Sequence, residues 1–280
     1  MTLLRNTSPE AGKDSPATGS AESFPVVRIS EEGGASQLEE AVAREIPLTI
    51  ILNDEELVTL LCYPEGLKYL AVGFLASEGL LDSKNEIKRV TVDDERGVVR
   101  VTTSRSGEVD PDLIFKRVIS SGCGRGASFY SVADASSLKV ESDLKISSGE
   151  IFALAKEFQR ASRLYLTTHA IHSAALCDGR KMLVFAEDIG RHNAIDKIFG
   201  KCLLEDIPTA DRLVITSGRI TSEILHKIAK RRIPVLISVS SPTNLGVSIA
   251  DSLGITLVAS VRGKKMVVYS HPERVVPDGK

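Results

Sequence analysis

Chemically active side chains are concentrated at residues 187–193, directly after an apolar run at 182–186 that predicts a buried strand. This stretch holds two carboxylates, a glycine, an arginine, a histidine and an amide. From Ala194 the apolar residues recur with the spacing of one helix face, which predicts a helix at 194–203. Arg191, His192 and Asn193 are therefore expected at a helix N-terminus, where free N–H groups and the helix dipole favour an anion such as phosphate. The pattern indicates a ligand site without naming the ligand.

Cys123 is the strongest candidate for a nucleophile. It lies in a loop at 119–128, where three glycines and three serines exclude the interior of a regular element. Arg125 beside it would favour the thiolate, the form of cysteine that does sulfur chemistry. A single loop cysteine is also often incidental, so both interpretations stay open. The sequence positions of Cys62, Cys177 and Cys202 favour core packing.

Three histidines, His169, His172 and His192, raise the question of a metal. The H-x-x-H spacing of the first two lacks the Cys-x-x-Cys and H-x-E partners of a deaminase zinc site, so hydrogen bonding is the favoured role. The pair Glu187 and Asp188 suits either acid–base chemistry or the shaping of a turn.

Two further basic groups also have alternative interpretations. Arg219 follows Ser217 and Gly218, which allow a backbone to approach a phosphate but equally begin a helix. The basic cluster at 262–265 suits either a ligand or a solvated hairpin turn.

Composition narrows the class of protein. The chain has 280 residues, 42% hydrophobic and 26% charged, which is ordinary for a soluble globular protein of one large or two modest domains. A formal net charge of −2 gives no support to nucleic-acid binding. No apolar run approaches the ~20 residues of a membrane span, and no signal-peptide pattern opens the sequence, so we expect a cytoplasmic protein. The four widely spaced cysteines do not predict a disulfide framework.

The elements that must position these residues fall into two units. The predicted strands at 25–29, 48–52, 57–61, 87–92 and 98–103, with a helix at 67–77 ending at Gly79, form a strand-rich α+β unit. We expect a disordered leader at 1–23, an N-terminal α+β domain at 24–118, a mobile cysteine loop and connector at 119–146, and a C-terminal α/β domain at 147–280.

Strands and helices alternate in the second unit. After a helix at 150–161, strands are predicted at 182–186, 212–216, 234–239, 255–261 and 266–270, with helices at 194–203, 220–231 and 245–253. This order predicts a three-layer α/β domain with a largely parallel sheet, closed by an antiparallel strand at 266–270. The polar segments at 187–193, 217–219, 240–244 and 262–265 all follow strands, so we expect them at one edge of the sheet, where such folds bind ligands.

The assembled motifs resemble the formate dehydrogenase accessory family, the FdhD/NarQ sulfurtransferases. The resemblance covers residues 25–274 and rests on LKYLAVGFLASEG (67–79), HAIHSAAL (169–176), EDIGRHNAIDK (187–197), SGRITSE (217–223), the SPT turn within 234–245, and the segment 262–272 containing VYSHP. Several long motifs in one order are far more specific than any one of them.

The resemblance implies a fold and a function. The C-terminal domain would be cytidine-deaminase-like without a zinc site. Cys123 would receive sulfur from a cysteine desulfurase as a persulfide and pass it to the molybdenum cofactor of formate dehydrogenase, bis-molybdopterin guanine dinucleotide. The expected cofactor-binding residues are Ser260, Val261, Arg262, Gly263, Lys264 and Lys265, together with Arg191, His192, Asn193, Arg219 and His172. Arginines suit the phosphates of a guanine dinucleotide, and the family leads us to expect a homodimer.

One position departs from the family pattern. Many members carry Cys-x-x-Cys in the loop, whereas Gly126 stands three residues after Cys123. A relay between two loop thiols is excluded, but a single thiolate can still accept and release sulfur. The loss leaves open a second hypothesis, a cofactor-binding chaperone without chemistry of its own. A third, a nucleotide hydrolase, would need a metal or an activated water.

Overall fold

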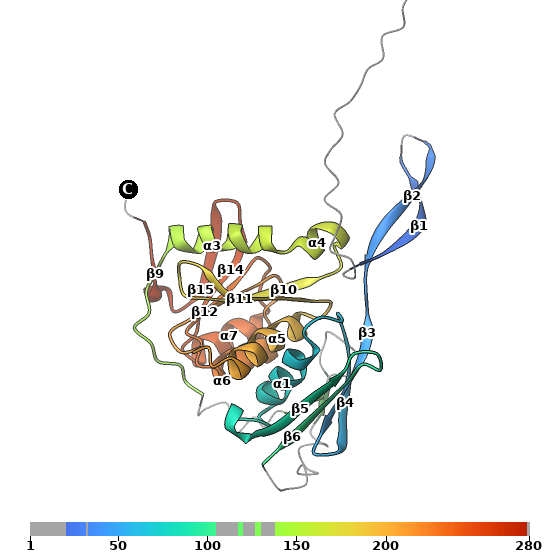
Figure 1. The fold of residues 1–280 in the computed structure, drawn as a ribbon. Coiled ribbons are helices and arrows are strands. Elements are labelled where there is room, and N and C mark those ends of the chain that lie inside the picture. The colour runs from blue at the N-terminus through green and yellow to red at the C-terminus, as the bar shows by residue number, and fades with distance from the viewer. Residues whose placement is uncertain (1–20, 32, 105–116, 120–126, 130–137, 279–280) are drawn as a thin grey trace, which may run out of the picture.

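The computed structural model describes residues 21–31, 33–104, 117–119, 127–129 and 138–278. Most of the described residues belong to two lobes, an N-terminal lobe (21–104) and a C-terminal lobe (138–278), shown in Figure 1. The short strands β7 (Arg117–Ile119) and β8 (Ala127–Phe129) lie between the two lobes in the sequence and pair with each other antiparallel. Cys123 lies outside the described residues.

The N-terminal lobe is a four-stranded sheet with one helix on it. The sheet has the order β4 (Glu55–Cys62), β3 (Ile46–Leu52), β6 (Val98–Thr103) and β5 (Ile87–Asp93), with the short helix η1 (Lys84–Glu86) before β5. Helix α1 (Leu67–Glu78) ends at Gly79, which adopts the left-handed backbone predicted for a glycine cap. Strands β1 (Ala21–Ile29) and β2 (Ala35–Ala43) form a hairpin that projects from the lobe (Figure 1). Strand β1 begins at Ala21, so the last three residues of the segment predicted as a disordered leader (1–23) belong to a strand.

The C-terminal lobe contains a six-stranded sheet with helices on both faces. Its strand order is β11 (Met182–Asp188), β10 (His172–Cys177), β12 (Leu213–Thr216), β13 (Val235–Ser238), β14 (Thr256–Arg262) and β15 (Lys265–Ser270). Its helices are α3 (Ser148–Ala161), α4 (Arg163–Thr168), α5 (Arg191–Leu204), α6 (Ser222–Lys230) and α7 (Asn244–Ser252). Helix α3 covers one face, and α5, α6 and α7 cover the other (Figure 1).

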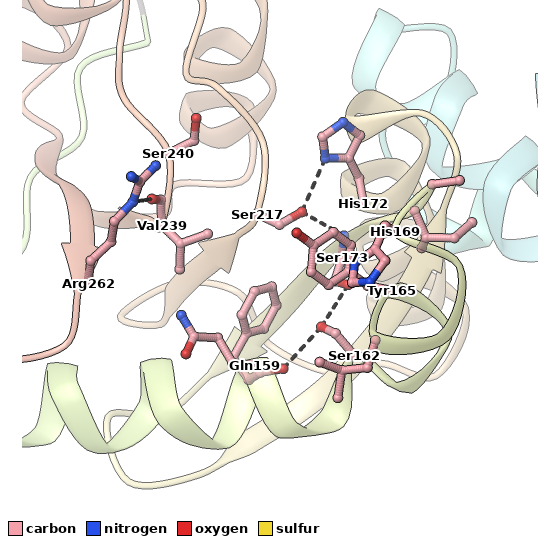
Figure 2. A pocket seen from close by; sticks show the side chains of 14 residues that line it. Gln159, Ser162, Tyr165, His169, His172, Ser173, Ser217, Val239, Ser240 and Arg262 are labelled. Atoms are coloured by element: carbon pink, nitrogen blue, oxygen red, sulfur yellow. Dashed lines mark hydrogen bonds between the residues drawn. The ribbon is translucent and has the colours of Figure 1, made fainter. Parts of the chain in front are cut away.

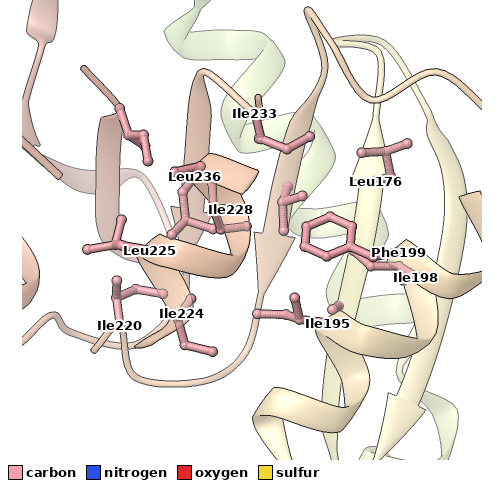
Figure 3. Packing of buried hydrophobic residues seen from close by; sticks show 14 of the residues in the cluster. Leu176, Ile195, Ile198, Phe199, Ile220, Ile224, Leu225, Ile228, Ile233 and Leu236 are labelled. Atoms are coloured by element: carbon pink, nitrogen blue, oxygen red, sulfur yellow. The ribbon is translucent and has the colours of Figure 1, made fainter. Parts of the chain in front are cut away.

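Alternate residues of the same strands supply the two cores. Ala174, Val214 and Leu236 pack with α5 and α6 in the larger core, part of which Figure 3 shows. Their neighbours Ala175 and Ile215 belong to the core on the opposite face, under α3. Period-two alternation with apolar residues on both faces is what a sheet between two helical layers requires. The predicted three layers are therefore present, while the likeness to cytidine deaminases stays a prediction.

The prediction of a largely parallel sheet is wrong. Only β12 with β13 and β13 with β14 pair in parallel, whereas β10 runs antiparallel to both β11 and β12. The predicted antiparallel strand at 266–270 is confirmed, because β15 runs antiparallel to β14. The sequence analysis did not predict β10 at all. Residues 178–181 join β10 to β11, and so short a connection permits only an antiparallel pair. The sheet is therefore mixed.

The VYSHP motif leads into the C-terminal segment, which pairs with the strand directly before α3. After η3 (Pro272–Arg274), strand β16 (Val275–Val276) pairs in parallel with β9 (Ile146–Ser147). The buried Arg274 guanidinium donates to the backbone oxygens of Gly254 at 2.9 Å and Ser142 at 3.1 Å. These contacts fasten the segment before α3 to the end of the chain.

Candidate functional site

Polar residues gather at one edge of the six-stranded sheet, as predicted. Because β10 is antiparallel to both β11 and β12, strands β11, β12, β13 and β14 all point the same way, and their carboxyl ends lie at one edge of the sheet. His172 lies at the same edge, because it begins the antiparallel strand β10. A cleft of about 720 Å³ opens there, within the range of small-molecule sites (Figure 2). It is lined by Phe158, Gln159, Ser162, Tyr165, Leu166, His169, Ala170, Ile171, His172, Ser173, Ser217, Val239, Ser240 and Arg262.

His172 forms one side of the cleft. Its Nδ1 lies 3.2 Å from Ser217 Oγ, and the same hydroxyl oxygen accepts the backbone N–H of Ser173 at 2.9 Å. Burial lowers the pKa of His172, and the nearby Arg191, His192 and Arg219 lower it further. The imidazole is therefore held in its neutral form.

Arg262 lies across the cleft from His172 (Figure 2). Its exposed side chain starts from the end of β14, and its Nε is 3.4 Å from the Val239 backbone oxygen. The preceding Ser260 adopts a left-handed backbone with φ of 55°, and its hydroxyl oxygen lies 3.1 Å from that of Ser241. Arg262 thus brings a cation to a rim rich in serine hydroxyls.

The remaining residues of the predicted cofactor segment do not line the cleft. Val261 is buried in the core under α3. Gly263, Lys264 and Lys265 are exposed at the turn between β14 and β15. Of the segment 260–265, only Arg262 is a lining residue.

Arg191, His192 and Arg219 surround the cleft without lining it. Arg191 is buried and packs against Gly218, where an added Cβ would lie 2.7 Å from the arginine Cβ. His192 Nε2 lies 3.1 Å from Glu223 Oε2, and this contact lowers the pKa of that carboxyl. Arg219 is exposed. All three side chains act electrostatically on His172 and lower its pKa.

Helix α4 supplies a wall that the sequence analysis missed. Glu187 on β11 accepts hydrogen bonds from the backbone N–H groups of Leu164 and Tyr165 at the start of α4, and its burial raises the pKa of its carboxyl. Ser173 Oγ lies 3.5 Å from Glu187 Oε1. Glu187 therefore anchors the helix that carries Tyr165 and Leu166 into the cleft. A six-residue helix has too little periodicity to be found from sequence.

Asp188, Asn193 and Lys197 join the two lobes. Lys197 Nζ, almost fully buried, contacts Asp188 Oδ2 at 2.7 Å and donates to the backbone oxygens of Tyr63 and Glu187 at 3.0 Å each. Asn193 Nδ2 donates to Asp188 Oδ1 and to the backbone oxygen of Leu61, both at 2.9 Å. The amide of Asn193 thus faces strand β4, outside the cleft.

A second buried ion pair links helices α5 and α6. Lys227 Nζ on α6 is 2.6 Å from Asp196 Oδ2 on α5, and Ser77 Oγ on α1 donates to Asp196 Oδ1 at 2.6 Å. Glycines let these helices approach closely, because a Cβ on Gly73 would lie 1.8 Å from the Asp196 backbone oxygen. The lobe interface is therefore close-packed as well as polar.

The prediction that three of the four cysteines pack in the core is confirmed. Cys62, Cys177 and Cys202 are buried free thiols, and burial raises the pKa of each to about 12. Within the described ranges, no three His, Cys, Asp or Glu side chains are grouped as metal ligands. None of the described helices combines the length and apolarity needed to cross a bilayer.

The fold and cleft define a class: a two-lobed α/β protein with a polar ligand cleft at the edge of its larger sheet. Residues 43–276 match the model of the FdhD/NarQ family, so the chain belongs to this family. It is 44% identical over 246 residues to the sulfur carrier protein FdhD of Bacillus subtilis (88% of this chain, 94% of that protein). It is 40% identical over 253 residues to FdhD of Staphylococcus aureus strain MRSA252 (90% and 95%).

A solved structure shares the whole fold. The crystal structure of a protein from Desulfotalea psychrophila, described as a formate dehydrogenase accessory protein, superposes with a TM-score of 0.74 at 29% identity. The match covers 91% of this chain and 99% of that one. Both lobes of the present fold are therefore found together in that relative.

Proposed function

We propose that this protein carries sulfur from a cysteine desulfurase, as a persulfide on Cys123, to the molybdenum cofactor that formate dehydrogenase requires. The observation that carries the proposal is the state of the other cysteines. Cys62, Cys177 and Cys202 are buried thiols whose pKa is raised to about 12, so none can supply a thiolate near neutral pH. Cys123 is the remaining thiol of the four. The names of the Bacillus and Staphylococcus relatives agree with this role.

The sulfur transfer balances as two exchanges. The Cys123 thiolate attacks the outer sulfur of the desulfurase persulfide, a new S–S bond forms, and the desulfurase cysteine leaves as a thiolate. On delivery, the bond between Cys123 and the outer sulfur breaks and the Cys123 thiolate returns. The transferred sulfur is reduced to sulfide, so the acceptor would have to be in a reduced state: molybdenum as Mo(IV) would supply the two electrons and become Mo(VI), and the persulfide proton would go to solvent.

The acceptor we propose is bis-molybdopterin guanine dinucleotide, held as substrate in the cleft between His172 and Arg262. The cleft volume of about 720 Å³ suits part of so large a molecule, such as one guanine nucleotide end. Arg262 matches a phosphate oxygen, and the serine hydroxyls on the rim match further acceptors.

Persulfide mapping tests the sulfur-carrying step. The full-length protein is incubated with a cysteine desulfurase and cysteine, and peptides are analysed by mass spectrometry under non-reducing conditions. We expect one added sulfur on the peptide containing Cys123, none on the peptides containing Cys62, Cys177 or Cys202, and none in the Cys123→Ala variant. An unmodified Cys123 after full turnover of the desulfurase would refute sulfur transfer.

A second candidate is a cofactor-binding chaperone without sulfur chemistry. Gly126 favours it, since the loop lacks the second cysteine of a thiol relay. The two functions separate in a strain that produces only the Cys123→Ala protein. A sulfur carrier predicts loss of formate dehydrogenase activity there, whereas a chaperone predicts activity equal to that of the wild type.

A further inference from the structure

Ser217 has a position that the backbone fixes. It follows β12, and its backbone N–H donates to the Ser173 oxygen at 3.0 Å. The N–H of Ser173 in turn donates to Ser217 Oγ at 2.9 Å. Ser173 belongs to β10 and Ser217 directly follows β12, so two backbone hydrogen bonds hold the Ser217 hydroxyl oxygen beside His172.

The hydroxyl of Ser217 has one proton to donate. His172 Nδ1, at 3.2 Å, is the acceptor for it among the described residues. If Nδ1 carried the imidazole proton, the Ser217 proton would have no acceptor in that part of the chain. Donation from Ser217 to Nδ1 satisfies both groups and leaves the imidazole proton on Nε2.

The surrounding charges keep this imidazole neutral. Arg191 and His192 at the start of α5, and Arg219 after β12, disfavour a further proton on His172. The opposing carboxylate, Asp188 at the end of β11, is engaged by Lys197 at 2.7 Å. Burial is the largest cause of the lowered pKa of His172 and acts in the same direction.

We propose that Ser217 fixes His172 as the tautomer protonated on Nε2, so that the cleft presents a neutral donor that selects a carbonyl or phosphoryl oxygen of its ligand. His172 Nε2 has no hydrogen-bond partner in the described ranges and lies on the side of the ring away from Ser217 (Figure 2). Ser217 is the positioning residue and His172 the ligand-contacting one. The identity of the ligand, a guanine nucleotide, rests on the proposed function, but the tautomer does not.

Nitrogen NMR of the full-length protein with labelled histidine tests the tautomer directly. Spectra of His172→Gln assign the His172 signals. At pH 7.5 we expect Nε2 protonated and Nδ1 unprotonated in the wild type, and a mixture of tautomers in Ser217→Ala. His169 lines the same cleft, and its signals should not change in Ser217→Ala. A proton on Nδ1, or on both nitrogens, in the wild type would overturn the proposal.

Binding of GDP, which carries the guanine and a diphosphate, tests the donor. In His172→Gln the side-chain amide can place an N–H near the position of Nε2, whereas in His172→Asn the amide reaches only the position of Nδ1. We expect His172→Gln to bind within about threefold of the wild type and His172→Asn about tenfold more weakly. Equal binding by the two variants would contradict the proposal.

ADP separates the two kinds of acceptor, since it has the diphosphate but no carbonyl on its base. If His172→Asn weakens GDP and ADP alike, the donor contacts the diphosphate, and if it weakens GDP alone, the donor contacts the guanine carbonyl. Either result supports the proposal. Absence of GDP binding by the wild type would count against the proposed function, while the NMR result would still decide the tautomer.

Discussion

The cleft and the lobe interface use the same kinds of side chain in opposite ways. At the interface, Lys197 and Asp188 are almost fully buried, and each lysine proton has an acceptor within 3.0 Å. In the cleft, Arg262 is exposed and makes one long contact to the backbone, while His172 Nε2 has no partner within the described ranges. Paired buried charges hold a structure together, whereas groups that are positioned but unpaired are available to a ligand.

This contrast divides the motif EDIGRHNAIDK. Glu187 anchors α4, and Asp188, Asn193 and Lys197 join the lobes. Arg191, His192 and Asp188 act on the cleft through their electrostatic effect on His172. A dense motif of polar residues is therefore mainly an inter-lobe joint in this protein. The cleft itself draws on the shorter motifs around His172 and Ser217.

Breaking the interface pair should have the largest effect. Lys197→Met removes the charge but keeps much of the length, and leaves Asp188 buried without its cation. We expect the free energy of unfolding in urea to fall by about 3–5 kcal/mol. The matched control is Lys84→Met, which removes an exposed partner of Asp206 and should cost less than about 1 kcal/mol. Equal costs would show that the interface pair is no more structural than a surface one.

Acid should destabilise the buried scaffold through His226 on α6. Burial and the nearby Lys230 lower its pKa from 6.5 to about 4. The unfolded chain therefore takes up the proton first, and stability is lost as the pH falls from 6.5 toward 4. The loss reaches about 3 kcal/mol at the lower end. His226→Gln should flatten this part of the pH dependence of unfolding, and an unchanged slope would contradict the assignment.

The helix contact at the interface should be sensitive to one added methyl group. A Cβ on Gly200 would lie 1.9 Å from the Tyr69 backbone oxygen, so Gly200→Ala must push α1 and α5 apart. We expect a loss of about 2 kcal/mol in thermal or urea unfolding. Gly179→Ala meets no atom within 4 Å and tests the cost of a left-handed backbone alone, about 1 kcal/mol. Indistinguishable losses would mean that the helices can separate freely.

Changes in the cleft should leave stability unchanged and alter binding. Arg262→Ala removes an exposed side chain, so the free energy of unfolding should stay within about 0.5 kcal/mol of the wild type. GDP binding should weaken about tenfold, as expected for the loss of a charged hydrogen bond. The exposed Arg160 on α3 does not line the cleft, and Arg160→Ala should bind normally. Equal weakening by both variants would indicate a general charge effect.

Local patterns made part of the fold predictable. Strands β3 and β4 and helix α1 with its Gly79 cap are confirmed because the residues that specify each of them are close in sequence. Strand β10 was missed, since its Ala-rich run lacks the β-branched residues that favour a strand. Its position between β11 and β12 then made the sheet mixed.

The site was predictable in outline only. Its edge of the sheet followed from the placing of polar residues after the predicted strands, and Arg262 is one of those residues. His172 was proposed through the family resemblance, because the strand that begins at His172 was not predicted. The role of Asp188 did not follow from the sequence, because its oxygen accepts the N–H of Tyr63, 125 positions away in sequence. Pairings over that separation leave no periodic signal, and so the interface residues looked like ligand residues.

A smaller cleft of about 230 Å³, lined in part by Tyr63, Tyr69 and Lys201, opens at the lobe interface. Hydrogen–deuterium exchange with and without GDP compares the two regions most directly, because it shows which of the two clefts GDP protects. We predict that GDP slows exchange in peptides spanning 162–173 and 239–240, at the cleft beside His172, and leaves peptides at 63–69 and 197–201 unchanged. Protection confined to the interface peptides would contradict the account.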